Sequence, residues 1–378
     1  MNGEPLPAYR IKARNTSATS ENKIHDDATA RRYGFRGGLV PGVTVYAYLT
    51  EPLVAALGPA WLERGTAAVR FLKPVVEGEE LAATGAVTAR DARVVAAAVT
   101  GATAAEPEAA TLTATLPSGL PTPVNLALYR PAPLPDPRPE ATREHLAALD
   151  TLGTPVHTYD ETAAAEWLDK MGDPLPLYRG RDGWVHPAFF LHQANQALRQ
   201  NVRLGPWIHT GSVVRHLGGA RIGETLAVRG RVRSVFEKKS REFVELDLVI
   251  VAGSRPRPVA HILHTAIFRL GGPDMAPPPL QVGAPAKPDA PPGASVTDEA
   301  GHGLVALGTG RAGTARAGDG HAGRLLRLLL RRRRAAGGCA GGGGSRAAAV
   351  AAVAALLGLL GPVPGAPARA PGRLVAGE

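Results

Sequence analysis

The clearest pattern along the chain is a long run of apolar positions at residues 43–57, with few polar residues among them. A helix that is apolar on all sides has no face for water, so we expect these residues to form one buried helix. Elsewhere apolar and polar residues alternate with a period of two, as in residues 110–116 and 242–249, and this alternation predicts strands. The combination predicts an α+β fold.

Short landmarks in the first half of the chain recur 145 positions later. The corresponding pairs are Gly38 and Gly183, Arg70 and Arg215, and Gly78 and Gly223. A constant offset between separate landmarks is typical of a tandem duplication. We therefore expect two copies of one unit, in which a glycine-containing turn leads into a long apolar helix and then three or four strands. The second helix is expected at about residues 189–198.

These features predict two repeats, residues 1–118 and 153–272, joined by a proline-rich crossover at residues 119–152. Residues 273–378 consist largely of Ala, Gly, Pro and Arg. Because such a segment cannot bury enough apolar surface to offset its chain entropy, we expect a disordered tail. Within it, the Leu- and Arg-rich residues 325–334 are either a basic surface helix or part of an unselected extension.

The chain has 378 residues, of which 44% are hydrophobic, and a formal net charge of +10. From residue 276 onward there are twelve basic and five acidic residues, so +7 lies in the predicted tail and only +3 on the first 275 residues. This near balance of the predicted repeats argues against a nucleic-acid partner.

The single cysteine, Cys339, excludes an intrachain disulfide and a thiolate zinc site, and we expect no metal and no cofactor. Residues 1–14 lack the apolar core of a secretory signal. The longest apolar run, residues 347–360, is shorter than the about 20 residues that a spanning helix needs. We therefore expect no membrane span and a cytoplasmic location.

The candidate chemistry lies just before the first helix. Residues 20–27 read Ser-Glu-Asn-Lys-Ile-His-Asp-Asp, and a glycine-rich turn at residues 33–42 follows. The first amides of a helix have no intrahelical partner and can hold a developing oxyanion. An imidazole near such a helix start can accept and return a proton at neutral pH. This order therefore indicates His25 as an acid/base group and the Gly42 amide as an oxyanion donor.

The segment resembles the signature of the MaoC-like (R)-specific enoyl-CoA hydratases. The family pattern reads Asp-x-Asn-Pro-x-His, followed by a glycine-containing turn and a His-Gly pair that opens the central helix. Asn22, His25 and Gly42 stand at matching positions. The resemblance implies a tandem (double) hotdog fold, in which an antiparallel sheet wraps one long helix in each repeat. The two repeats would form an intramolecular pseudo-dimer, with association into a homodimer left open.

The resemblance also implies a lyase of fatty acid metabolism. The expected activity is that of an (R)-type enoyl-CoA hydratase, or 3-hydroxyacyl-thioester dehydratase, with an acyl-CoA or an acyl carrier protein thioester as partner. In such an enzyme His25 would transfer the proton, Asn22 would position the ring or the water, and the Gly42 amide would polarise the thioester carbonyl.

Ser20 stands where the family has its catalytic Asp, and a hydroxyl cannot act as a general base at neutral pH. Three outcomes are open: His25 works alone, Asp26 or Asp27 reaches the water instead, or the protein binds acyl thioesters without hydrating them. A hotdog thioesterase is a further alternative. It would need a carboxylate on the central helix, where Glu51 is the only acid.

Further residues are candidates for substrate binding. Arg36, close to the motif, is a candidate for the phosphates of CoA, and Gly37 and Gly38 would allow close approach of the substrate. The second repeat has no copy of the motif, and the resemblance implies that such a half opens its pocket for the acyl chain. We therefore expect Trp184 and Phe189 to line this pocket, with ordinary core packing as the alternative.

Overall fold

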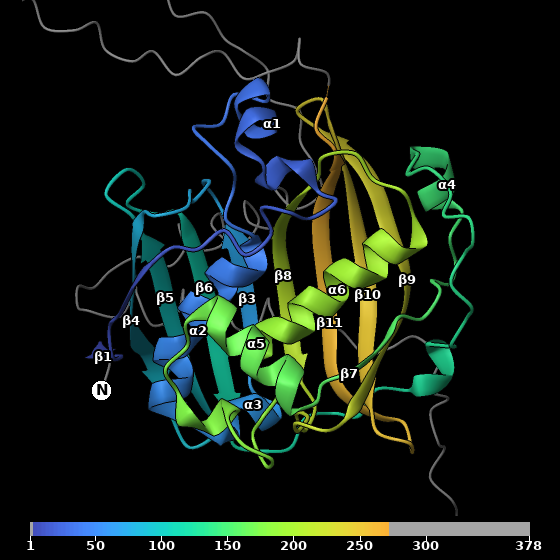
Figure 1. Ribbon diagram of the computed structural model, residues 1–378. Helices are drawn as coiled ribbons and strands as arrows, with labels where there is room; N and C mark the ends of the chain where they lie inside the picture. The colour runs from blue at the N-terminus through green and yellow to red at the C-terminus, as the bar shows by residue number, and fades with distance from the viewer. Residues whose placement is uncertain (1–2, 272–378) are drawn as a thin grey trace, which may run out of the picture. The chain divides into compact units, whose positions relative to one another are not determined.

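The structure is a computed structural model, and it describes residues 3–271 of the chain (Figure 1). Strands are its most numerous elements. They are β1 (Glu4–Pro5), β2 (Tyr9–Lys12), β3 (Thr66–Phe71), β4 (Glu80–Arg90), β5 (Val94–Ala102), β6 (Ala110–Pro117), β7 (Val156–Thr158), β8 (Ile208–His216), β9 (Thr225–Lys238), β10 (Arg241–Ala252) and β11 (Arg257–Arg269).

The helices are fewer, and two of them are long. The α-helices are α1 (Asp27–Arg32), α2 (Gly42–Leu57), α3 (Pro59–Arg64), α4 (Arg143–Ala147), α5 (Glu161–Met171) and α6 (Pro187–Asn201). Short 3-10 helices are η1 (Lys23–His25), η2 (Leu126–Leu128) and η3 (Pro176–Tyr178).

All the strands belong to one antiparallel sheet. Its order is β1-β4-β5-β6-β3-β8-β11-β10-β9-β7, and β2 also pairs with β4. The first repeat supplies β3 to β6 and the second supplies β8 to β11, so the pairing of β3 with β8 joins the two repeats.

Equivalent residues of the two repeats meet at this junction. Ala68 of β3 lies opposite Val213 of β8, which is the residue 145 positions later. A residue that pairs with its own equivalent lies on the symmetry axis of a repeated structure. The two repeats are therefore related by a pseudo-two-fold axis that passes through this pair.

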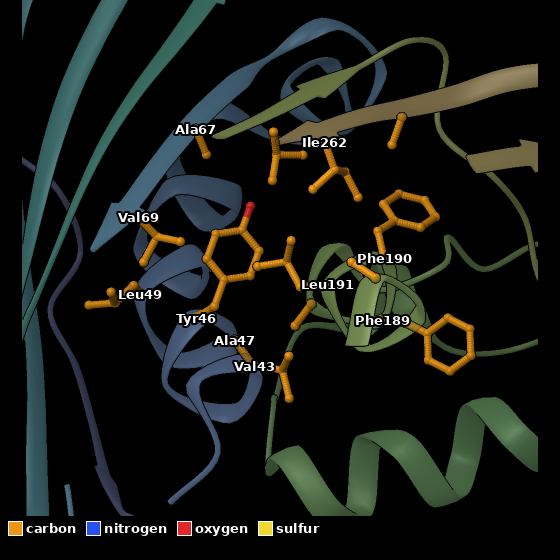
Figure 2. Packing of buried hydrophobic residues seen from close by; sticks show 14 of the residues in the cluster. Val43, Tyr46, Ala47, Leu49, Ala67, Val69, Phe189, Phe190, Leu191 and Ile262 are labelled. Atoms are coloured by element: carbon orange, nitrogen blue, oxygen red, sulfur yellow. The ribbon is translucent and has the colours of Figure 1, made fainter. Parts of the chain in front are cut away.

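The long helices α2 and α6 contact each other and lie against the same face of the sheet (Figure 1). They begin at equivalent positions, Gly42 and Pro187, again 145 residues apart. The segment of α2 from residue 43 to residue 54 is buried throughout, as the apolar pattern predicted. Figure 2 shows Tyr46 of α2 and Phe190 of α6 in one apolar cluster with side chains of the sheet.

Local signals set the two ends of α2. Pro41 precedes its first residue and has a backbone φ of −56°, which suits the entry into a helix. At the other end Gly58 adopts a φ of +64°, and its amide donates to the carbonyl oxygen of Val54 at 2.9 Å. Glycine adopts this left-handed conformation without steric cost, and Pro59 then begins α3.

The predicted α+β architecture of two hotdog repeats is confirmed, since each repeat has one long buried helix against an antiparallel sheet. Between the repeats lie only the short elements η2 and α4, and Val124 and Tyr129 of this stretch pack near Val249 of β10. The predicted tail, residues 273–378 with Cys339, lies outside the described residues. Among residues 3–271, no helix combines the length and the apolar character needed to cross a membrane.

Two histidines of the sheet are fully buried, His216 of β8 and His264 of β11. Burial lowers the pKa of each imidazole to about 3. Glu51 of α2 is shifted in the opposite sense, because burial, and then the nearby Asp173, raise its pKa to about 7. The two histidines therefore stay neutral at pH values where an exposed histidine is charged.

We expect the free energy of unfolding to fall as the pH decreases from about 6.5 towards 4. In this range the unfolded chain binds protons at ordinary histidine pKa values, whereas His216 and His264 stay neutral in the folded chain. Each such group contributes about 1.4 kcal/mol per pH unit, and the opposite contribution of Glu51 offsets one of them. Denaturant titrations at several pH values measure this slope.

The variant His216→Leu should reduce the slope by about one proton, while Val156→Ala, a change at an exposed side chain that does not titrate, should leave it unchanged. An unaltered slope in His216→Leu would contradict the assignment of a neutral buried imidazole.

Candidate active site

A cavity of about 200 Å³ lies at the start of α2. Both repeats contribute to its walls, although the sequence motif belongs to the first repeat alone. Its polar lining includes Asn22, His25 and the Gly42 backbone from the first repeat, and Asn195 and His209 from the second. Apolar side chains, among them Phe35, Val45, Phe71 and Ile267, cover much of the remaining surface.

The ring of His25 is held by the segment that leads into α2. Its Nδ1 atom lies 2.7 Å from the carbonyl oxygen of Leu39. Because a carbonyl oxygen only accepts, Nδ1 carries the hydrogen and Nε2 carries the free electron pair. Burial lowers the pKa of the imidazole, and the bond to Leu39 acts in the opposite direction. At neutral pH the ring is therefore uncharged, and Nε2 can accept a proton.

Glycines 37 and 38 bring the His25 loop against the chain that precedes α2. The Gly38 amide donates to Oδ1 of Asp27 at 2.7 Å, and Asn15 Nδ2 donates to the carbonyl oxygen of His25 at 2.7 Å. A Cβ atom at Gly38 would collide with that same carbonyl oxygen of His25. Neither glycine lines the cavity. The close approach of Gly38 to the His25 carbonyl oxygen instead positions the His25 loop.

Asn22 connects the motif to the second repeat. Its Oδ1 accepts from the amide of Trp207 at 3.1 Å, and its Nδ2 donates to the carbonyl oxygen of Trp207 at 2.9 Å. This pair of bonds fixes the orientation of the side-chain amide, because one end must accept and the other must donate. Nδ2 also lies 3.3 Å from Nε2 of His25. Asn22 thus sets the position of the imidazole relative to the second repeat.

Gly42 is the first residue of α2, so its amide has no intrahelical acceptor. A Cβ atom at this position would lie 2.9 Å from Cε2 of Phe71 and 3.1 Å from Nδ1 of His209. The absence of a side chain therefore lets these two rings approach the positive end of the helix. Gly42 and His25 line the same cavity.

The equivalent helix start in the second repeat is closed. Pro187 occupies the position of Gly42 and has no N–H. The next two amides are used locally, since Ala188 donates to Nδ1 of His186 at 3.1 Å and Phe189 donates to the carbonyl oxygen of His186 at 2.9 Å. The His186 ring is fully buried, and its Nε2 lies 3.1 Å from Oδ2 of Asp173. No amide of this first turn is left for a ligand.

A second cavity of about 120 Å³ adjoins the first and shares Asn22, His25, Asn195 and Trp207 with it. Ser20 lines this second cavity only, and its Oγ donates to the carbonyl oxygen of Asn22 at 3.4 Å. The basic residues of its lining are Arg138, Arg199 and Arg203.

The carboxylates of the two residues after His25 accept hydrogen bonds from backbone amides. Oδ1 of Asp26 accepts from the amide of Thr29 at 2.9 Å and begins α1, and this backbone bond lowers the pKa of the Asp26 carboxyl. Asp27 holds the Gly38 amide. Neither carboxylate lines either cavity, so the alternative in which Asp26 or Asp27 reaches the attacking water is not favoured.

The remaining expected binding residues lie elsewhere. Arg36 forms an ion pair with Glu79 at 2.8 Å. Trp184 packs beneath the guanidinium of Arg221, 3.5 Å from the ring centroid, and Phe189 contacts the rings of α5 and its neighbours. None of the three lines the cavities around His25. Trp184 and Phe189 belong to the apolar core cluster, as in the alternative of ordinary core packing.

Sequence reasoning did not identify Asn195, Trp207 or His209. For Asn195 there was a signal, because polar residues recur on one face of α6 at spacings of three and four. They are His192, Asn195, Gln196 and Arg199, and all four line the second cavity. Within residues 3–271, no group of three His, Cys, Asp or Glu side chains forms a candidate metal site.

A scan against protein-family models and a search of curated proteins give no match to this chain. Solved structures do match. A putative MaoC domain protein dehydratase from Chloroflexus aurantiacus has a TM-score of 0.52 and 12% identity, and the match covers 72% of this chain and 96% of that one. A MaoC-like dehydratase has a TM-score of 0.49 and 14% identity over 69% of this chain and 97% of that one.

A Mycobacterium tuberculosis protein described as having a double hotdog fold has a TM-score of 0.47 and 15% identity, over 71% of this chain and 96% of that one. Structures described as an oleoyl thioesterase from Lactobacillus plantarum and an acyl-CoA thioesterase II from Mycobacterium marinum match with lower TM-scores, 0.41 and 0.38. At 12% identity, the likeness to the C. aurantiacus protein shows a shared fold and leaves the activity to be argued from the site.

The variant Gly38→Ala should displace the His25 loop, because the new methyl group meets the His25 carbonyl oxygen and backbone atoms cannot move away independently. We expect a loss of stability of about 1–3 kcal/mol, as for overpacking in a core. We also expect the ring to lose its bond to Leu39, which NMR of the imidazole nitrogens would detect. Gly119→Ala is the control, since a Cβ there meets nothing within 4 Å. Equal stability and unchanged ring signals in both variants would contradict this account.

Proposed function

We propose that this chain is an (R)-type enoyl-thioester hydratase, which also catalyses the reverse dehydration of 3-hydroxyacyl thioesters. One observation carries the proposal: His25, whose Nε2 is the acceptor nitrogen, and Gly42, whose amide has no hydrogen-bond partner among residues 3–271, line the same cavity. The fold supports it, because the C. aurantiacus protein that shares this fold is described as a MaoC domain dehydratase.

The Gly42 amide would act on the thioester carbonyl. When water adds to C3 of a 2-enoyl thioester, negative charge develops on the carbonyl oxygen. A backbone N–H at a helix start, supported by the helix dipole, can donate to that oxygen. Loss of one such donor typically costs about 2.7–4 kcal/mol of transition-state stabilisation.

His25 would move the proton. Nε2 takes a proton from the water as its oxygen bonds to C3, and the resulting imidazolium returns this proton to C2. The product has gained one water, and the ring ends in its starting state. The reverse sequence removes water from the hydroxyacyl thioester. Asn22 keeps the ring in place, and Asn195, whose Oδ1 has no hydrogen-bond partner among residues 3–271, lines the same cavity.

The second cavity offers positive charge for the carrier part of the substrate. Glu21 pairs with Arg138 and Arg199, each at 3.3 Å, whereas Arg203 is exposed and makes no ion pair within residues 3–271. A free guanidinium suits a phosphate, and both CoA and the phosphopantetheine of a carrier protein supply one.

Two alternatives belong to other classes. A non-catalytic thioester-binding protein would use the same cavity, and Ser20 in place of an Asp is the observation that favours it. A thioesterase would need a carboxylate aimed at the thioester. Glu51 does not line the cavities around His25, and its pKa of about 7 leaves much of it protonated at neutral pH.

The hydration of crotonyl-CoA and longer 2-enoyl-CoAs tests the proposal. His25→Ala should lower kcat/KM by a factor of about 10²–10⁴, as expected for the loss of a general base, while His157→Gln should not. In the wild type, kcat/KM should decrease as the pH falls through the pKa of His25, below its usual 6.5, because only the neutral ring accepts a proton.

A purified wild-type protein that hydrates none of these thioesters would refute the enzymatic proposal. Ser20→Asp then separates the alternatives. If the wild type is a degenerate binder, only this variant, which restores the carboxylate of the family pattern, should show turnover.

Arg203→Ala should raise KM for an acyl-CoA several-fold with little change in kcat, because it removes a contact remote from the reacting atoms. Arg36→Ala is the matched comparison, since its guanidinium already pairs with Glu79. A rise of KM in Arg36→Ala and none in Arg203→Ala would place the phosphates of the substrate at Arg36 instead.

A further inference from the structure

One buried polar side chain that lines the cavity has no role in the proposed reaction of His25 and Gly42. His209 of β8 is only 6% exposed, and its Nδ1 atom has no hydrogen-bond partner among residues 3–271. This atom lies 3.1 Å from the place where a Cβ of Gly42 would be, and the edge of the Phe71 ring supports the imidazole. Nδ1 is therefore directed at the start of α2, and His209 lines the same cavity as His25.

A β-bulge gives His209 this direction. Along β8, Ser212, Val214 and His216 are buried, as period-two alternation requires. That alternation would send His209 to the other face. The pairing of β8 with β11 shifts register between Thr265 and Ala266, so that one extra residue of β8 is accommodated. The shift returns His209 to the buried face, and bulges near active sites commonly redirect a side chain in this way.

The other nitrogen of His209 belongs to a short chain of hydrogen bonds. Nε2 lies 2.8 Å from Oγ of Ser212, and this oxygen lies 3.0 Å from Nδ1 of His264. The two imidazoles also stack, with centroids 4.1 Å apart. Nε2 of His264 has no partner among the described residues, and the ring is fully buried.

Ser212 can accept from one ring and donate to the other in two arrangements. In the first, His209 donates from Nε2 to Ser212, Ser212 donates to His264, and the unpaired N–H is Nε2–H of His264. In the second, all directions are reversed, and the unpaired N–H is Nδ1–H of His209. A buried orphan N–H is costly, and a carbonyl oxygen bound beside Gly42 would remove this defect only in the second arrangement, so binding of a carbonyl favours that arrangement.

The charge state of the His209 ring is consistent with a role as hydrogen-bond donor. Burial, and then the neighbouring His264, lower the pKa of His209 well below its usual value, so the ring is neutral at pH 7. A neutral imidazole is a weak acid but a good hydrogen-bond donor, and it can polarise a carbonyl without carrying a charge.

We propose that His209 is a second catalytic residue, whose Nδ1–H donates to the thioester carbonyl oxygen beside the Gly42 amide. The identity of the substrate rests on the proposed function, whereas the direction of the donor rests on the cavity and the Ser212–His264 chain. The oxyanion site then draws one donor from each repeat.

The test uses butyryl-CoA with a ¹³C-labelled carbonyl, a saturated thioester that cannot be hydrated, bound to the full chain. Infrared difference spectra should show a carbonyl stretch at lower frequency than in free butyryl-CoA. His209→Leu should move it part of the way back, and His209→Asn, whose amide can donate near the position of Nδ1, should retain most of the shift. With crotonyl-CoA, His209→Leu should lower kcat by about 10²–10³ with little change in KM.

His216→Leu is the matched control, because it removes another buried imidazole of β8 that does not line the cavity. It should leave the carbonyl frequency unchanged, and thermal melts show whether each variant is folded. If His209→Leu is unfolded, the ¹⁵N shifts of His209 in the wild type with butyryl-CoA bound decide, since a hydrogen on Nε2 instead of Nδ1 overturns the proposal.

The outcomes separate this inference from the proposed function. Suppose that the wild type turns over crotonyl-CoA and that His209→Leu has the same carbonyl frequency and the same kcat as the wild type. This result overturns the proposal that His209 is a hydrogen-bond donor, and the hydratase proposal stands. A carbonyl frequency that is lowered on binding and depends on His209, without any turnover of crotonyl-CoA, supports the proposal that His209 is a donor and refutes the hydratase proposal. A wild-type protein that binds no butyryl-CoA overturns both.

Discussion

The antiparallel pairing of β3 with β8 is the contact on which the candidate site depends. It joins the two repeats into one sheet around the pseudo-two-fold axis at Ala68 and Val213. It also brings Phe71, at the end of β3, and His209, near the start of β8, to the first residue of α2. The first repeat contributes His25 and the helix amide, and the second repeat completes the walls, so neither repeat has the whole cavity.

The symmetry of the backbone is not repeated in the chemistry. Both long helices start at equivalent positions, but one starts with Gly42, which lines a cavity, and the other with Pro187 and a buried His186–Asp173 pair. The difference follows from a few residues. A proline removes the first donor, and an imidazole accepts the next one. The closed helix start adds to the core, whereas the open one is available for a ligand.

Features that recur along the sequence could be predicted from the sequence alone. The apolar run at residues 43–57 and the offset of 145 residues predicted the buried helix and the duplication, because both are periodic properties of the chain. Contacts between distant residues were beyond reach, as the bond from Asn22 to Trp207 illustrates, since it joins positions 185 residues apart. His209 was missed for a different reason: a register shift in the sheet reverses the alternation from which its face would be inferred.

The fusion of two repeats in one chain has a consequence for how the halves can change. In a dimer of identical chains, any substitution appears on both sides of the axis, so a residue that helps one pocket is imposed on the other. Here the halves are encoded separately. The second repeat can close its own helix start and still contribute His209 to the cavity at the other helix start. Within residues 3–271, only one of the two equivalent helix starts is then open to a ligand.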